Sequence, residues 1–225
     1  MVVLSKDWCW WPEYLRGLYI PKARCCVDTY DNSIYRFAMK QHSIRAVLLD
    51  RDGVINYDSP DYILSPHDWR PIPGSLEAIA RLCCENIAVA IVSNQSALGR
   101  GMLDQTTFQA IHAKMMLAIE EAGGMIAHTA YCPHAPEDAC ECRKPKPGLV
   151  FETLKVLGLE RHTEESVFIG DSVRDVQAAA AAGVRPMLVQ TGYGDAGKIH
   201  ARSAKLYPGI ETHPDLAAAV ASVLE

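Results

Sequence analysis

The sequence has no apolar stretch long enough to span a membrane, and no basic segment followed by an apolar one near its start. The first absence argues against a transmembrane helix and the second against a secretory leader. Runs of basic residues are also absent, and the net charge of −5 gives no reason to expect a nucleic-acid partner. We therefore expect a soluble, cytoplasmic protein that binds neither membranes nor nucleic acid.

The eight cysteines do not have the spacing of a disulfide framework. They fall as a single residue, two adjacent pairs and a tight trio at positions 132, 140 and 142. This clustering favours thiols and a metal site over a disulfide framework. The chain also lacks internal repeats.

About half of the 225 residues are hydrophobic, which is enough to form one substantial core. We predict a single domain over residues 41–225 and expect a monomer. Residues 1–40 differ, because tryptophans crowd their beginning and no helical or strand period persists through them. Our hypothesis is that this extension is poorly ordered or lies upstream of a true start at Met39; an ordered extension that caps the domain is the alternative.

Apolar, β-favouring segments alternate with segments of helical periodicity along the rest of the chain. The predicted strands are residues 44–49, 87–92, 125–131, 166–169 and 187–189, and the predicted helices are 74–82, 103–122, 148–157, 174–182 and 215–224. Residues 191–208 are predicted to be irregular. The alternation predicts an α/β fold, a three-layer, doubly wound (Rossmann-like) parallel sheet.

Polar residues follow the predicted strands directly. Asp50 and Asp52 end the first strand, Ser93 follows the second and Asp171 follows the fourth. Residues two apart in extended backbone point to the same side, so the first two carboxylates can face one small volume. Since sites in such sheets lie at the carboxyl ends of strands, we expect these groups to share one site.

The residues at this edge are those that phosphoryl transfer requires. Carboxylates with water and a phosphate oxygen suit Mg²⁺. A lysine and a hydroxyl, here Lys144 and Ser93, can hold phosphate oxygens and balance charge during transfer. The sequence therefore predicts a magnesium-dependent phosphoryl-transfer site.

The order of these groups resembles the haloacid dehalogenase superfamily of phosphohydrolases. Its four motifs are matched by residues 50–54, by Ser93, by Lys144, and by Asp171 with Asp175. Ser93 replaces the commoner threonine and keeps the hydroxyl. The resemblance covers residues 44–194. No large insertion separates the four motifs, so we expect no separate cap domain.

The resemblance implies a catalytic set of Asp50, Asp52, Ser93 and Lys144. Asp50 would attack phosphorus and give an aspartyl phosphate. Asp52 would protonate the leaving alkoxide and then take a proton from the attacking water.

The resemblance also implies that Mg²⁺ binds the Asp50 carboxylate, the Asp52 main-chain carbonyl and Asp171. Asp175 lies one helical turn beyond Asp171. It would not bind the metal directly but would hold a neighbouring residue in place, either Arg174 or Lys144.

A second group of residues has the spacing of a metal site. Cys132, His134, Cys140 and Cys142 form two pairs of alternate residues, and each pair can direct both donors to one side of an extended segment. Four such donors fit a closed, tetrahedral, structural Zn²⁺ site in the loop 132–142. Free thiols beside a loop histidine are the alternative. The zinc would pin the loop that carries Arg143 and the neighbouring lysine.

The zinc loop narrows the resemblance to the branch that holds D-glycero-D-manno-heptose 1,7-bisphosphate phosphatases and histidinol-phosphate phosphatases. Residues 93–101 and 65–69 look more like the heptose enzymes. The substrate-binding residues that we expect are Arg51, Asn94, Gln95, Ser96, Arg100 and Arg143.

The expected function is therefore Mg²⁺-dependent removal of the 7-phosphate from a heptose 1,7-bisphosphate, in the synthesis of lipopolysaccharide heptose precursors. A histidinol-phosphate phosphatase is the nearest alternative. A mutase would normally need a cap that excludes water. The alternative from a different functional class is a zinc-stabilised binding module, a protein without enzymatic activity that keeps only the relic of an active site.

Overall fold

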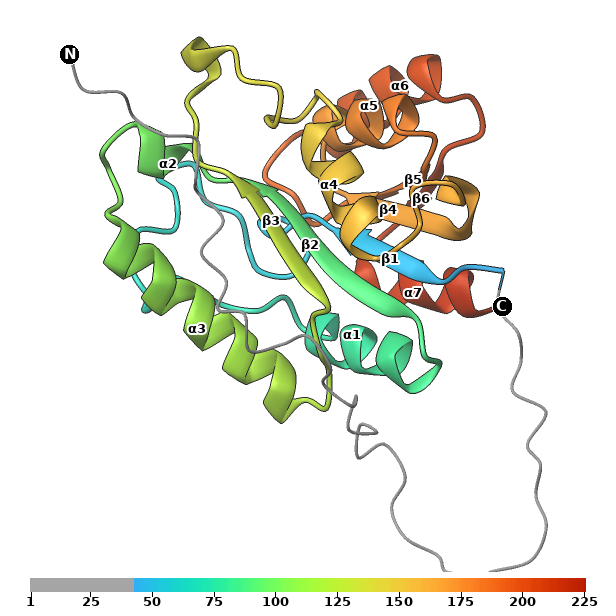
Figure 1. The fold of residues 1–225 in the computed structure, drawn as a ribbon, viewed down its shortest axis with the longest axis horizontal. Coiled ribbons are helices and arrows are strands. Elements are labelled where there is room, and N and C mark those ends of the chain that lie inside the picture. Colours follow the sequence, from blue (N-terminus) through green and yellow to red (C-terminus); the bar gives the residue numbers. More distant parts are fainter. Residues whose placement is uncertain (1–42) are drawn as a thin grey trace, which may run out of the picture.

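The computed structural model describes residues 43–225, so the hypothesis for residues 1–40 lies outside the described part of the chain. A six-stranded parallel sheet forms the centre (Figure 1). In spatial order its strands are β3 (His128–Cys132), β2 (Ala88–Asn94), β1 (Ala46–Leu49), β4 (Ser166–Gly170), β5 (Arg185–Val189) and β6 (Glu211–His213).

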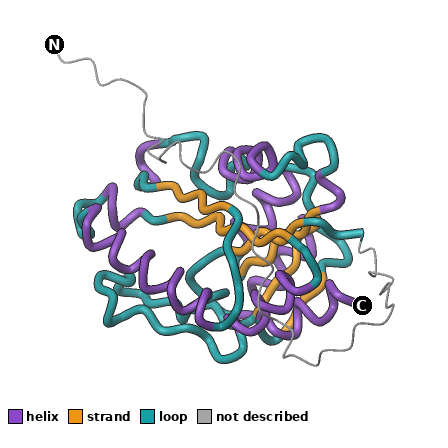
Figure 2. The backbone as a smooth tube through the Cα atoms, turned by 60° about the horizontal axis from the view of Figure 1, so that its bottom comes forward, coloured by secondary structure: helices purple, strands orange, loops and turns teal. Residues whose placement is uncertain are grey.

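Helices cover both faces of the sheet and give three layers, as Figures 1 and 2 show. One face is covered by α1 (Ser75–Cys84), α3 (Gln105–Glu121) and α7 (Leu216–Leu224). The other is covered by α4 (Gly148–Val156) and α5 (Val173–Ala181), and α6 (Ala196–Leu206) packs on α5. The short helix α2 (Ser96–Gly99) follows β2. Within residues 43–225, no helix has the length and apolar character that a membrane span requires.

The central strand β1 is fully buried, and its side chains alternate between two cores. Val47 and Leu49 pack with the α1, α3 and α7 layer, whereas Ala46 and Leu48 pack with the α4 and α5 layer. Parallel strands buried on both faces are near-continuous apolar runs, which is what residues 44–49 are. The predicted doubly wound α/β sheet is confirmed.

The prediction for residues 191–208 is wrong. This segment contains α6, and β6 follows it and pairs with β5. The helix is hard to recognise because it contains few large apolar residues, and Ser203 is its only buried residue. Its start is fixed locally, since the Asp195 carboxylate accepts from the Lys198 backbone N–H, as expected of an N-cap.

Candidate active site

A cavity of about 230 Å³ lies at the carboxyl edge of the sheet, above the end of β1. Strand ends place its groups: Asp50 follows β1, Ser93 and Asn94 end β2, and Asp171 follows β4. The charged residues that line the cavity are Asp50, Arg51, Asp52, Asp58, Arg143, Lys144, Asp171 and Arg174. The sheet thus brings together groups from segments more than 100 residues apart, as the sequence predicts.

A buried ion-pair network lies at the floor of this cavity. The Nζ of Lys144 is 2.8 Å from the Asp50 carboxylate and 2.7 Å from the Asp175 carboxylate. It also donates to the Val92 carbonyl oxygen at 2.8 Å. Asp175 accepts from the backbone and hydroxyl of Ser172 at 3.0 and 2.6 Å. One almost fully buried cation is therefore shared between two carboxylates.

Burial and mutual repulsion perturb these carboxylates. Burial raises the pKa of Asp50 to about 6; Lys144 lowers it in part, and Asp175 and Asp52 raise it. Burial, followed by the charges of Asp175 and Asp50, raises the pKa of Asp171 to about 8. For Asp175 burial is outweighed by the charge and hydrogen bond of Lys144, so its pKa is lowered. The cluster holds more negative charge than Lys144 balances.

Such a cluster suits a divalent cation. Asp50, Asp171 and Asp175 each direct a carboxylate oxygen to within 4.8 Å of the others. Asp50 and Asp171 line the cavity, whereas Asp175 does not and has both of its oxygens bound by Lys144 and Ser172, so the first two carboxylates are the ones that a cation in the cavity can reach. Carboxylate oxygens that lie this close together fit Mg²⁺, which binds through one or two carboxylates and keeps several waters.

Asp52 is held in one orientation by three partners. The Arg51 guanidinium binds it through two nitrogens at 3.0 and 2.8 Å, Asn56 donates to it at 2.8 Å, and Gln95 donates at 3.0 Å. Arg51 and Gln95, which we expect to contact substrate, line the cavity and also bind this carboxylate, so their contact with substrate stays a prediction. Sequence reasoning missed Asn56, whose oxygen accepts from Trp69 and which no motif marks.

Of the other predicted substrate-binding residues, three line the cavity and one does not. Ser96 and Arg143 line the cavity. The Asn94 side chain lines it too, but donates to the Lys144 carbonyl oxygen and accepts from its N–H, both at 3.1 Å, and so holds the lysine backbone. Arg100 is not among the lining residues and pairs with Glu137 at 3.3 Å.

Two further charged residues lie at the cavity mouth. Arg174, expected behind the site, is exposed and lines the cavity itself. Sequence reasoning missed Asp58, on the loop that follows Asp52. Burial and the Asp52 charge raise the pKa of Asp58, while the charge of Arg174 lowers it in part.

The predicted zinc ligands are together in the structure. The Sγ atoms of Cys132, Cys140 and Cys142 lie 3.3 to 3.6 Å apart. Nδ1 of His134 is 3.3 Å from Cys142 and 3.6 Å from Cys132. A tetrahedron with about 2.3 Å Zn–S bonds has edges of about 3.8 Å, so these four donors fit Zn²⁺ with little adjustment.

This cluster connects directly to the cavity. Cys132 is the last residue of β3, and Cys142 immediately precedes Arg143 and Lys144. The Arg143 guanidinium also donates to the His134 carbonyl oxygen at 3.1 Å. A metal at the cluster would therefore fix the segment that supplies two cations to the cavity.

Binding of Mg²⁺ is expected to weaken as the pH falls below 8. The metal-free Asp171 carboxyl, with a pKa of about 8, carries a proton at lower pH, and Mg²⁺ must displace it. The dissociation constant, measured by titration calorimetry on the substrate-free protein, should rise by up to about tenfold between pH 8 and pH 7. A constant affinity from pH 6 to 8.5 would contradict this assignment of the proton.

Comparisons with known proteins give the family. Residues 141–219 match the HAD-hydrolase-like family model. D-glycero-beta-D-manno-heptose-1,7-bisphosphate 7-phosphatase of Pseudomonas putida is 45% identical over 154 residues, which are 68% of this chain and 86% of the relative. The enzyme of the same name from Pseudomonas aeruginosa is 41% identical over 80% of this chain and 97% of its own length. The chain belongs to the heptose 1,7-bisphosphate 7-phosphatase family of HAD-like hydrolases.

A solved structure supports this membership. The chain is similar to D,D-heptose 1,7-bisphosphate phosphatase from Bordetella bronchiseptica, solved as a complex with magnesium and phosphate. The TM-score is 0.75 at 42% identity, over 80% of this chain and 98% of that one. The sequence-based resemblance to the haloacid dehalogenase superfamily and its heptose 1,7-bisphosphate phosphatases is confirmed.

Proposed function

We propose that this chain is a Mg²⁺-dependent phosphatase that removes the 7-phosphate of D-glycero-D-manno-heptose 1,7-bisphosphate and leaves the 1-phosphate in place. In this role it would serve the synthesis of lipopolysaccharide heptose precursors. One observation carries the proposal: Asp50, Lys144, Asp171 and Asp175 form a single buried cluster under the cavity of a chain that is 42% identical to a heptose bisphosphate phosphatase complexed with magnesium and phosphate.

In this proposal Asp50 is the nucleophile. Its carboxylate is 14% exposed, at the cavity floor, and one of its oxygens is bound by Lys144. The backbone N–H of Arg51 donates to the other oxygen at 2.7 Å. These two donors orient the carboxylate toward an incoming phosphorus atom, and the lysine offsets part of the negative charge of the cluster.

Asp52 would transfer the proton. Its side chain, held by Arg51, Asn56 and Gln95, is 22% exposed and lines the cavity beside Asp50. It would protonate the departing C7 oxygen and then remove a proton from the water that hydrolyses the aspartyl phosphate. The three donors keep it from turning away between the two steps.

The two metals would have different tasks. Mg²⁺ at the Asp50 and Asp171 carboxylates would neutralise the phosphate oxygens as charge develops on them. Zn²⁺ at the four-donor cluster would be structural, because Cys132, His134, Cys140 and Cys142 leave no position open.

The remote end of a bisphosphate needs cations at the cavity mouth. Arg143 and Arg174 both line the cavity, and among residues 43–225 neither has a carboxylate within ion-pair distance. They reach the cavity from opposite sides of Asp50, Arg143 through the segment beside β2 and Arg174 from α5 after β4. We therefore assign substrate recognition to these two residues, with Ser96 beside them.

The position of cleavage tests the proposal. Phosphorus NMR of the reaction of heptose 1,7-bisphosphate with Mg²⁺ should show loss of the 7-phosphate signal, growth of inorganic phosphate in equal amount and retention of the 1-phosphate signal. Loss of the 1-phosphate, or phosphate transfer to the sugar product without release, would contradict it.

Replacing one zinc ligand should affect both metal content and turnover. A Cys142→Ser variant is expected to lose bound zinc and to melt about 5 °C or more below wild type, which corresponds to roughly 2 kcal/mol. Turnover should fall as well, because Arg143 follows this ligand directly. The matched control is Cys83→Ser, since Cys83 exchanges hydrogen bonds with the Met125 backbone and lies outside the cluster. Full zinc content in Cys142→Ser, measured by elemental analysis, would contradict the assignment.

A further inference from the structure

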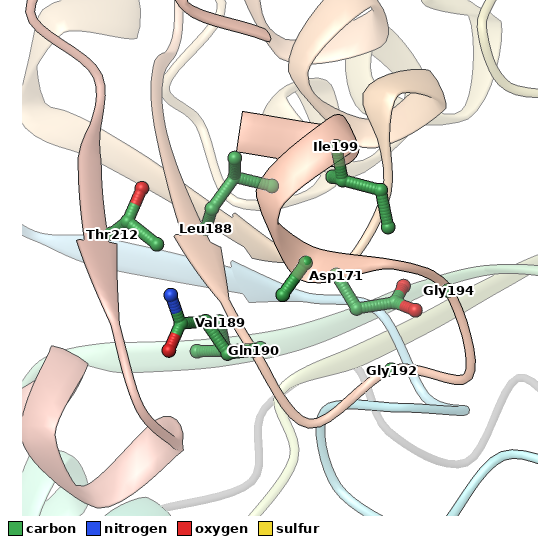
Figure 3. A pocket seen from close by; sticks show the side chains of 9 residues that line it. Asp171, Leu188, Val189, Gln190, Gly192, Gly194, Ile199 and Thr212 are labelled. Atoms are coloured by element: carbon green, nitrogen blue, oxygen red, sulfur yellow. The ribbon is translucent and has the colours of Figure 1, made fainter. Parts of the chain in front are cut away.

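The segment that follows β5 passes directly against the Asp171 carboxylate. Figure 3 shows this carboxylate directed toward the stretch that carries Gly192 and Gly194. A Cβ atom at Gly192 would collide with Oδ2, Cγ and Cβ of Asp171. The backbone of Gly192 is not in the left-handed region, so an alanine could adopt its conformation. Space for the carboxylate, and not backbone freedom, is therefore what this glycine provides.

A second glycine also lies against the same carboxylate. A Cβ at Gly53 would lie 2.7 Å from Asp171 Oδ2 and 3.0 Å from the Cα of Gly192. The hydroxyl of Thr191 donates to the Gly53 carbonyl oxygen at 2.6 Å and ties the two glycine segments together. Asp171, which is 9% exposed, is thus packed against two backbone segments that lie far apart in sequence, one at Gly53 and one at Gly192.

We propose that Gly192 is a positioning residue for the divalent-cation site, acting through Asp171 with the Thr191 to Gly53 hydrogen bond as its support. The inference rests on the Mg²⁺ site of the proposed function. An added methyl group at residue 192 pushes the carboxylate toward Asp50 or rotates it, and either movement changes the angle at which its free oxygen meets the cation. Metal affinity is sensitive to such support, because partners that orient a ligand typically change it by about 10- to 100-fold.

Titration calorimetry with MgCl₂ on the substrate-free protein tests this. For Gly192→Ala we expect the Mg²⁺ dissociation constant to rise by about tenfold or more. The Mg²⁺ concentration that gives half-maximal turnover should rise by the same factor, with most of the kcat recovered at saturating Mg²⁺. A change that only loosened the fold would lower the melting temperature without this shift in Mg²⁺ dependence.

Two further variants serve as a control and as a second test of the inference. Gly197→Ala is the matched control, because its Cβ would meet only Asp195 at an ordinary 3.4 Å, and it should bind Mg²⁺ like wild type. Thr191→Val removes the supporting hydroxyl and should weaken binding several-fold even if Gly192→Ala fails to fold.

The outcomes separate this inference from the proposed function. Wild-type Mg²⁺ affinity in a folded Gly192→Ala, or in Thr191→Val if the former is unfolded, overturns the inference alone. A wild-type protein that binds no Mg²⁺ overturns the inference together with the magnesium chemistry. A failure to cleave the heptose bisphosphate leaves the calorimetric result intact and counts only against the substrate.

Discussion

Replacing Asp50 by asparagine is expected to lower phosphate release by on the order of 10⁴-fold, the scale on which enzymes lose rate when a nucleophile is removed. An amide oxygen cannot form the aspartyl phosphate, although it has the same shape as the carboxylate and still accepts from Lys144. The fold should persist, because removing this charge also relieves its repulsion with Asp175 and Asp52. Steady-state phosphate release and circular dichroism measure the two parts of the prediction.

The control for this variant is Asp61→Asn. Asp61 is exposed on the loop after β1, and its side chain is outside the cavity lining. The Asp61→Asn variant should therefore retain the wild-type rate of phosphate release. An Asp50→Asn preparation that kept more than about a tenth of the wild-type rate would remove Asp50 as the nucleophile.

Replacing Lys144 by methionine is expected to affect both stability and activity. The lysine is 2% exposed and is the cation shared by Asp50 and Asp175. Removing it leaves buried carboxylates without a partner, a change that typically costs about 3–5 kcal/mol. Loss of a group that balances charge in the transition state should lower kcat by about 10² to 10³-fold. Urea denaturation and steady-state kinetics measure these two effects.

A double variant separates the two effects. In Lys144→Met with Asp175→Asn, one of the unpaired buried charges is gone, so part of the stability should return. Activity should not return, since the cation beside Asp50 is still missing. Strictly additive free energies of unfolding for the two substitutions would contradict the network, because partners in contact are expected to couple by about 0.5 kcal/mol or more.

The central part of the fold could be predicted because its sequence signals are local. The strands β1, β2 and β4 are continuous apolar runs that end in polar residues, and each helix between them has an apolar stripe. The tail could not be predicted in the same way. Helix α6 buries one residue and β6 has three, so neither carries a pattern strong enough to distinguish it from a loop.

The candidate site, too, could be predicted only in part from the sequence. Motif spacing was sufficient to bring Asp50, Lys144 and Asp171 to one edge, because the ends of parallel strands meet there. The partners of these residues depend on tertiary contacts with no local signal. Arg51 turning back onto Asp52 and Asn94 holding the Lys144 backbone are examples, and the approach of Gly192 to Asp171 is another. Sequence could name the chemical groups but not which of them orient the others.

The central claim is the identity of the substrate. The direct measurement is phosphate release at pH 7 with Mg²⁺ from heptose 1,7-bisphosphate and from histidinol phosphate at matched concentrations, with Asp50→Asn as the blank. We predict that kcat/KM for the heptose bisphosphate is higher by about tenfold or more, which corresponds to roughly 1.4 kcal/mol of transition-state preference. A higher kcat/KM for histidinol phosphate would contradict the heptose assignment while leaving the aspartyl-phosphate chemistry in place.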